Sequence, residues 1–328
     1  NNMYLFPVME CLTSMIPAVG IGGFQNEAIH ALIKCMRINE NTLLMNNYAD
    51  YYEDYDTTGS ISKQTPVPPT TGAILPPNTT NYFVNIQELI SSPGYSTSAK
   101  EDDIPPKDFA ICALDMLSSI VSTLKEHFAM LLASTDGEIN KEQLFHDRNI
   151  CPAIVKTDAI FMNVLLICLQ DKLVEVKQST FSLIGDVCRY CPSLILPSAH
   201  NNNQHAILSQ ILAVTLENIS NHADNSKGMF APMLCNDALW MFGELILQIQ
   251  EYCKNNNNPN VAAFMGPEFI QQHVMPTVMR VLSQCCKNNQ QLPPSVQQNA
   301  GILLSRLVIV NPSAIDSVIS SCFASWCK

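Results

Sequence analysis

The fold is decided by an eight-residue pattern that occurs four times, in Ala113-Leu-Asp-Met-Leu-Ser-Ser-Ile120, Thr180-Phe-Ser-Leu-Ile-Gly-Asp-Val187, Ala238-Leu-Trp-Met-Phe-Gly-Glu-Leu245 and Ala300-Gly-Ile-Leu-Leu-Ser-Arg-Leu307. Each copy begins with Ala or Thr and has apolar residues at the fourth, fifth and eighth positions. This spacing places the apolar side chains on one face of a helix. The sixth position is always Ser or Gly. We expect it to admit a neighbouring helix closely, because a Gly within a helix otherwise costs about 1 kcal/mol relative to Ala.

Elsewhere, apolar residues also recur at three- and four-residue spacing, and strand-like alternation is nearly absent. Further helices are predicted at 5–19, 24–46, 155–170, 205–219, 268–286 and 312–327. Polar stretches separate them at 134–149, 198–204, 221–228, 254–263 and 287–293. The pattern predicts an all-α fold, a solenoid of stacked antiparallel helix pairs.

The stretch at 47–104 interrupts the helical pattern. It begins with Tyr48-Ala-Asp-Tyr-Tyr-Glu-Asp-Tyr55 and continues through Pro-rich sequence, so it is too poor in apolar residues to build a core. We predict a largely disordered insertion, with a partner-recruiting acidic arm as the alternative. The predicted organisation is therefore a helix pair at 1–46, the insertion at 47–104 and further repeats at 105–328. Because the chain opens within an apolar pattern, we expect a piece of a longer protein.

Composition narrows the possible functions. The 18 Lys and Arg against 29 Asp and Glu give a net charge of -11, which disfavours nucleic-acid binding and favours basic partners. The 13 Cys are scattered singly through apolar stretches, which is typical of a reducing compartment. Cys188 and Cys191 form a C-x-x-C motif, for which we favour a structural role over a redox or zinc site because no second ligand pair stands at suitable spacing. No signal peptide or apolar run of about 18 residues is present, so membrane insertion is not expected.

Catalysis finds no support in the motifs. The seven His are dispersed, and no Gly-rich phosphate loop occurs. Asp115 and Asp186 offer a conceivable acid and base pair, but they belong to different repeats of an open surface that would not exclude water. We predict that the protein is not an enzyme and uses no cofactor or metal.

In stacked helix pairs of this kind, the second helices line the concave surface, and their unburied stripe faces the ligand. That stripe is mostly polar here and consists of Ile111, Asp115, Ser119, Gln178, Ser182, Asp186, Asn236, Trp240, Glu244, Gln298, Ile302 and Arg306. Trp240 is the aromatic residue of this stripe, and we interpret it as an exposed aromatic anchor, with burial under a neighbouring loop as the alternative. With Ile302, Asp115 and Asp186 it predicts a surface for a ligand that has hydrophobic and basic residues.

Residues 171–180, Asp-Lys-Leu-Val-Glu-Val-Lys-Gln-Ser-Thr, resemble the turn of a HEAT repeat, in which an Asp is followed by Val and a basic residue. Five ordered blocks, at 5–12, 107–117, 170–181, 235–244 and 299–307, resemble the transportin branch of the importin-beta (karyopherin-beta) family of nuclear import receptors. The resemblance spans nearly the whole chain except 47–104 and the Asn-rich loops.

The resemblance implies the C-terminal arch of a superhelix, which binds the upstream hydrophobic or basic part of Pro-Tyr nuclear localization signals. By matching motif positions, it implies cargo contacts for Ile111, Asp115, Gln178, Asp186, Trp240, Ser295 and Ile302. Two departures are Ser122, where the family has an acidic residue, and Pro232, where it has an apolar one. These departures predict a weaker basic subsite and a reshaped hydrophobic surface.

The resemblance further implies a monomer that shuttles between cytoplasm and nucleus and carries cargo proteins. Ran GTPase and nucleoporins would bind through the full-length receptor, and the Ran surface, the acidic loop and the Pro-Tyr pocket are expected upstream of these residues. The alternative function is a HEAT scaffold subunit whose inner surface holds a folded protein partner.

Overall fold

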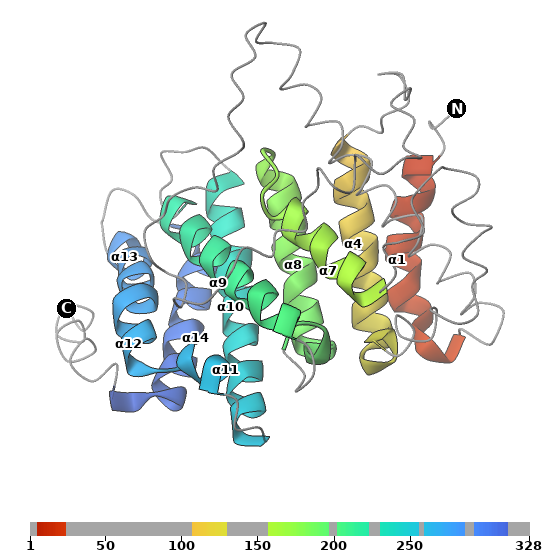
Figure 1. The fold of residues 1–328 in the computed structure, drawn as a ribbon. Helices are drawn as coiled ribbons and strands as arrows, with labels where there is room; N and C mark the ends of the chain where they lie inside the picture. Colours follow the sequence, from red (N-terminus) through yellow and green to blue (C-terminus); the bar gives the residue numbers. More distant parts are fainter. Residues whose placement is uncertain are drawn as a thin grey trace, which may run out of the picture. The chain divides into compact units, whose positions relative to one another are not determined.

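The computed structural model describes residues 5–23, 107–129, 157–196, 202–222, 230–255, 259–285 and 292–313 (Figure 1). Within these ranges the regular structure is entirely helical, so the predicted all-α class is confirmed. The chain divides into two compact units, Asn1–Cys168 and Leu169–Lys328. The predicted helix at 24–46, the insertion at 47–104 and nearly all of the predicted helix at 312–327 lie outside the described residues.

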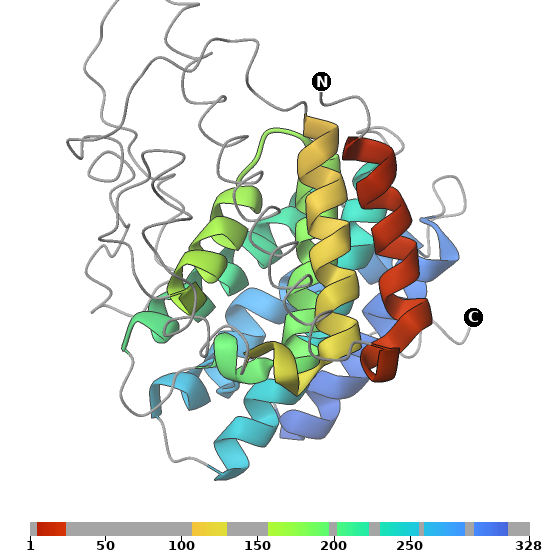
Figure 2. The same ribbon diagram turned by 90° about the vertical axis from the view of Figure 1, so that its right-hand side faces the viewer.

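The first unit contains α1 (Leu5–Gly23), α4 (Lys107–Leu124) and α7 (Thr157–Cys168). Helices α1 and α4 lie side by side (Figure 2). Near the start of both helices the rings of Phe6 and Phe109 meet edge to face, with centroids 5.7 Å apart. Helix α1 extends beyond the predicted 5–19 but is kinked at Gly20, whose φ of 63° lies in the left-handed region.

The second unit is built mainly from α8 (Val174–Tyr190), α9 (Asn202–His222), α10 (Phe230–Asn255), α13 (Met275–Cys285) and α14 (Pro294–Val310). Helix α10 packs against α8 on one side and α14 on the other, and it also contacts α9 (Figure 1). Helix α13 contacts α9 and α14. Helices α8, α10 and α14 therefore form one layer, and α9 and α13 form the other.

Short helical pieces connect these elements. A 3₁₀ turn at Pro192–Leu194 follows α8, and α12 (Pro267–Phe269) continues through the π-helical turn Ile270–Val274 into α13. The stretch 254–263 was predicted to be a polar interruption, but it contains the five-residue helix α11 (Pro259–Ala263). The helix is explained by Pro259 at its first position and by Val261, which is fully buried.

The repeated eight-residue pattern behaves as predicted. Its first-position residues Ala113, Thr180, Ala238 and Ala300 are all fully buried. The apolar fourth, fifth and eighth positions are buried in all four copies, at Met116, Leu117, Ile120, Leu183, Ile184, Val187, Met241, Phe242, Leu245, Leu303, Leu304 and Leu307. Each copy therefore contributes the same helical face to a core.

Two buried polar residues, one in the second copy of the pattern and one just before it, are satisfied locally. The Thr180 hydroxyl donates a hydrogen bond of 2.6 Å to the Val176 carbonyl, one turn earlier. In the turn before α8, the Asp171 carboxylate accepts a hydrogen bond of 2.8 Å from the Leu173 backbone N–H. This Asx turn gives a physical role to the Asp of the HEAT-like signature, because it shapes the chain as it enters α8.

The close approach expected at the sixth position is present at both glycines. A Cβ on Gly185 of α8 would lie within 2.8 Å of three atoms of the Trp240 ring on α10. A Cβ on Gly243 of α10 would lie 2.7 Å from Arg306 Nη1 on α14. Each glycine therefore makes room for a large side chain from the next helix of the layer.

We expect Gly185→Ala to lower the free energy of unfolding by roughly 1–3 kcal/mol, because the added methyl group overlaps the Trp240 ring. Gly301→Ala is the matched control: this helical glycine has open space where the methyl group would be added, so the change should be neutral or stabilising by up to about 1 kcal/mol. Urea unfolding of both variants measures the difference. Equal stabilities would contradict the proposed role of Gly185.

Candidate functional site

The seven predicted cargo-contact residues are divided between the two units. Ile111 and Asp115 lie on α4 in the first unit. The other five lie in the second unit on α8, α10 and α14, and they are Gln178, Asp186, Trp240, Ser295 and Ile302. Each unit therefore presents a candidate surface of its own.

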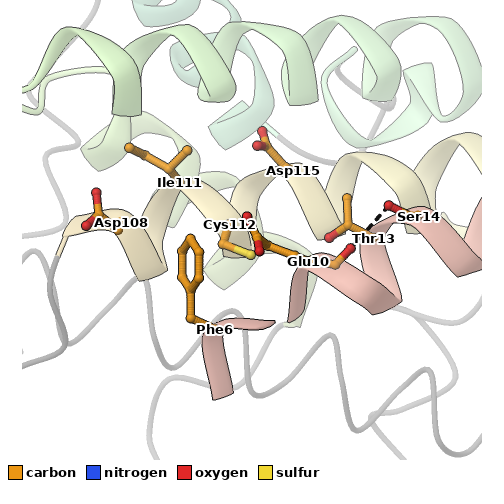
Figure 3. Close-up of a pocket in the computed structure, with 8 residues that line it drawn as sticks. All are labelled: Phe6, Glu10, Thr13, Ser14, Asp108, Ile111, Cys112 and Asp115. Carbon is orange, nitrogen blue, oxygen red and sulfur yellow. Dashed lines mark hydrogen bonds between the residues drawn. The ribbon is translucent and has the colours of Figure 1, made fainter. Parts of the chain in front are cut away.

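In the first unit, a pocket of about 330 Å³ lies between α1 and α4 (Figure 3). Its lining includes the predicted residues Ile111 and Asp115, and the other residues that line it are Phe6, Glu10, Thr13, Ser14, Asp108 and Cys112. Three of these eight side chains are acidic and none is basic. An acidic rim beside apolar groups suits a basic side chain with an aliphatic stem.

The pKa of the Cys112 thiol responds to its surroundings in this pocket. Burial raises the pKa of Cys112 to about 11, and the nearby carboxylates of Asp115 and Glu10 add to the rise. The two carboxylates therefore disfavour a negative charge at the Cys112 thiol.

Sequence reasoning missed Glu10 and Asp108. The two helices run in the same direction, with Phe6 near Asp108 and Ser14 toward Asp115 (Figure 3). Glu10 joins this pocket only because α1 packs beside α4, and no spacing between residues 10 and 108 predicts that. Ser122, the departure from the family pattern, is half-buried and donates a hydrogen bond of 3.1 Å to the Ser119 carbonyl.

In the second unit, Trp240 is half-buried, with its six-membered ring against the backbone of Gly185. The ring is therefore packed on a neighbouring helix and also partly open to solvent. Met233 is 46% exposed and lies seven residues earlier, which is about two turns along the same face of α10. Ile302 on α14 is 40% exposed.

Two polar contacts establish the register of α10 and α14. The Asn299 side-chain amide donates to the Asn236 side-chain oxygen at 2.9 Å, and the Arg306 guanidinium donates to the Glu244 carboxylate. On α14, Ile302 lies between Asn299 and Arg306, and on α10, Trp240 lies between their partners Asn236 and Glu244. Ile302 and Trp240 therefore occupy the same position along the two helices. We call Met233, Trp240 and Ile302 the apolar wall.

Pro232 is the second departure from the pattern that the resemblance implies. Pro232 is buried, whereas the next residue, Met233, is exposed. The chain therefore presents an apolar side chain one position later than the pattern would place it. Sequence reasoning missed Met233, although its seven-residue spacing from Trp240 was a usable signal.

A polar network runs beside the apolar wall. The Asp237 carboxylate accepts hydrogen bonds from Gln178 and Ser182 of α8 and from the Asn236 amide at 2.9 Å. Asn299 of α14 then donates to Asn236. Burial raises the pKa of Asp237, and the three hydrogen bonds offset part of that rise. Gln178, a predicted cargo contact, is thus already engaged within the fold.

The far end of this surface is charged. Glu244 of α10 is only 7% exposed, unlike the other residues of the predicted polar stripe, none of which is buried. Arg306 Nη2 of α14 donates to Glu244 Oε1 at 2.9 Å. Asp186 of α8 is half-buried. Burial raises the pKa of the Cys188 thiol, and the carboxylates of Glu244 and Asp186 add to the rise.

Ser295 is exposed in the first turn of α14, directly after Pro294. Its position therefore leaves the hydroxyl accessible at the end of the layer.

Cys188, near the C-terminal end of α8, and Cys191, directly after that helix, are both buried, and neither forms a disulfide. Within the part of the chain that the structure describes, no cluster of three or more His, Cys, Asp or Glu side chains is arranged to hold a metal ion. Among those same residues, every helix is too short or too polar to cross a membrane.

The Glu244–Arg306 pair should contribute measurably to stability, because Glu244 is shielded from water. In a double-mutant cycle with Glu244→Gln and Arg306→Met, we expect a coupling energy of about 2 kcal/mol. The control is the Glu251–Lys254 pair on α10, whose side chains are 62% and 60% exposed and which should couple by less than about 1 kcal/mol. Chemical denaturation provides both values, and equal coupling in the two pairs would be the contrary result.

Known proteins provide a comparison for these surfaces. No protein-family model matches the chain. It is 25% identical over 237 residues to importin subunit beta-2 of Schizosaccharomyces pombe, which covers 70% of this chain and 20% of that protein. It is 27% identical over 248 residues to human transportin-1, with 74% and 21% covered, and 24% identical over 222 residues to transportin-1 of Oryza sativa subsp. japonica, with 68% and 19% covered.

The chain spans about a fifth of the length of these relatives. Their names are those of transport receptors and not of enzymes, which supports the prediction of a protein without catalytic activity. Over about 70% of its length the chain is therefore similar to importin subunit beta-2 and transportin-1.

Proposed function

We propose that this chain is part of a nuclear import receptor and that its concave face binds the upstream hydrophobic or basic part of nuclear localization signals of the Pro-Tyr type. The observation that carries the proposal is the apolar wall, in which Trp240, Met233 and Ile302 remain partly exposed on adjacent helices. Exposed aromatic and aliphatic side chains that lie together are typical of protein-binding surfaces. The similarity to importins and transportins supports the same function.

The contact between Trp240 and Gly185 would favour binding. Because one edge of the ring rests on the backbone of α8, the side chain loses little conformational freedom when a ligand covers its remaining surface. An aromatic side chain held in this way supplies contact area at low entropic cost. Trp240 is therefore the proposed hydrophobic anchor, with Ile302 and Ser295 as contacts on α14.

The pocket of the first unit is the proposed site for basic residues of the signal. Asp115 would bind a Lys or Arg side chain, and Ile111 would contact its aliphatic part. Glu10 and Asp108 add two carboxylates to the same pocket, which offsets the missing charge at Ser122. In the second unit, Gln178 and Asp186 are the proposed polar contacts.

The properties of the whole receptor are proposed from the family resemblance alone. They comprise a monomer that shuttles between cytoplasm and nucleus, binds Ran GTPase and contacts nucleoporins. The proposed organisation remains a helix pair at 1–46, an insertion at 47–104 and repeats at 105–328.

Replacing Trp240 by Ala should weaken binding of a hydrophobic and basic signal peptide by about 30-fold, corresponding to roughly 2 kcal/mol, because the anchor of the wall is lost. Leu173→Ala is the matched control, since Leu173 is 36% exposed but lies in the turn before α8. Fluorescence anisotropy of a labelled peptide gives both affinities. If the affinity survives Trp240→Ala, the wall is not the cargo site and a scaffold that holds a folded partner becomes the better explanation.

Affinity for the same peptide should fall as ionic strength rises, because carboxylates of the first unit are proposed to contact its basic residues. Asp115→Asn should weaken binding at low salt and reduce this dependence. Glu217→Gln removes one exposed carboxylate on α9, a helix that carries none of the proposed contacts, and should leave the dependence unchanged. A salt-independent affinity in the unaltered protein would contradict the proposed basic subsite.

A further inference from the structure

We infer that Arg306 determines the ligand specificity of the second unit by taking the place of a basic ligand side chain at Glu244. The inference rests on the proposed function and assigns a role to a residue that the proposed contacts do not include. Its consequence is that the second unit selects uncharged, apolar ligand side chains, while basic side chains bind elsewhere.

The geometry of Arg306 is specific. Its Nη2 donates to Glu244 Oε1 at 2.9 Å, and its Nη1 lies 2.7 Å from the point that a Cβ on Gly243 would occupy. The guanidinium therefore lies directly over the backbone of Gly243 and beside the carboxylate of the next residue. A Cβ at position 243 would require the guanidinium to shift, so the glycine admits Arg306 at the position where it pairs with Glu244.

Without Arg306, the Glu244 carboxylate would be an attractive partner for a cation. A Lys or Arg side chain of a ligand could then take the place of the guanidinium at Glu244 Oε1. Arg306 is a cation supplied by the protein itself, and it leaves Glu244 only 7% exposed.

The two units thus differ in whether a basic side chain accompanies the carboxylates of their candidate surfaces. In the first unit, Glu10, Asp108 and Asp115 line a pocket without a basic side chain among its eight lining residues. In the second unit, the carboxylate that lies one helical turn beyond Trp240 is paired with Arg306. A peptide segment on the apolar wall therefore meets apolar side chains beside a neutralised ion pair, which disfavours a charged side chain there.

A pair of labelled peptides tests this inference. One peptide carries only apolar and small uncharged residues, and the other is identical except for two Arg in place of two Ala. We expect Arg306→Ala to improve the affinity for the Arg-containing peptide by about tenfold relative to the uncharged one, with a steeper salt dependence, because Glu244 becomes available. Arg306→Lys keeps the positive charge and should retain the original preference.

Two further variants separate specificity from stability. Glu244→Gln combined with Arg306→Ala removes both charges and should abolish the gain. Gly243→Ala shifts the guanidinium while keeping both charges. It should change the ratio of the two peptide affinities in the same direction as Arg306→Ala, and it provides a second test if Arg306→Ala folds poorly. Circular dichroism melting identifies the variants that are folded.

The outcomes are distinguishable. If both peptides bind the unaltered protein and the ratio of their affinities is unchanged in folded Arg306→Ala and Gly243→Ala, the ion pair is purely structural and the inference is wrong. If neither peptide binds the unaltered protein, the proposed function of the wall fails, and the inference fails with it.

Discussion

The layer of α8, α10 and α14 depends on two places where a helix has no side chain. At Gly185 and Gly243 the next helix of the layer inserts a Trp ring and an Arg guanidinium against bare backbone. Apolar burial alone does not specify such contacts, because it is non-directional. The close contacts at the two glycines fix the register between neighbouring helices, which apolar faces alone would leave undetermined. The positions of Trp240 and Arg306 follow from that register.

Polar contacts reinforce the same register. Buried or half-buried polar groups cost free energy unless they are hydrogen-bonded, and here they bond across the layer. Asp237 receives bonds from α8, and Asn236 receives one from Asn299 on α14. Because a one-residue slip would leave several of these groups unsatisfied, the network opposes sliding of the helices. A surface intended to hold a ligand needs this kind of rigid support.

The distribution of charge is informative beyond the net value of -11. Three of the eight residues that line the pocket of the first unit are acidic, whereas Glu244 in the second unit is paired with an Arg. Acidic composition therefore does not translate into a uniformly acidic binding surface. It is the pairing of individual carboxylates that decides where a basic ligand residue would be favoured and where an apolar one would be.

Several features could be predicted from the sequence because they depend only on spacing along one helix. The burial of Ala113, Thr180, Ala238 and Ala300 and the small sixth position follow from the 3.6-residue period. So does the stripe that contains Trp240 and Ile302. Local turn chemistry at Asp171 was accessible for the same reason, since donor and acceptor are two residues apart.

Contacts between helices were decided by tertiary structure alone. Glu10 reaches the pocket beside Asp115, and Arg306 reaches Glu244, across separations of about 100 and 62 residues that carry no periodic signal. The exposure of Met233 in place of Pro232 depends on which face of α10 its neighbours cover. The sequence by itself determined which face of each helix is buried, because that face follows from spacing along one helix. Which side chains from different helices meet, and which carboxylate is paired with an Arg, depended on the packing register that the glycines allow.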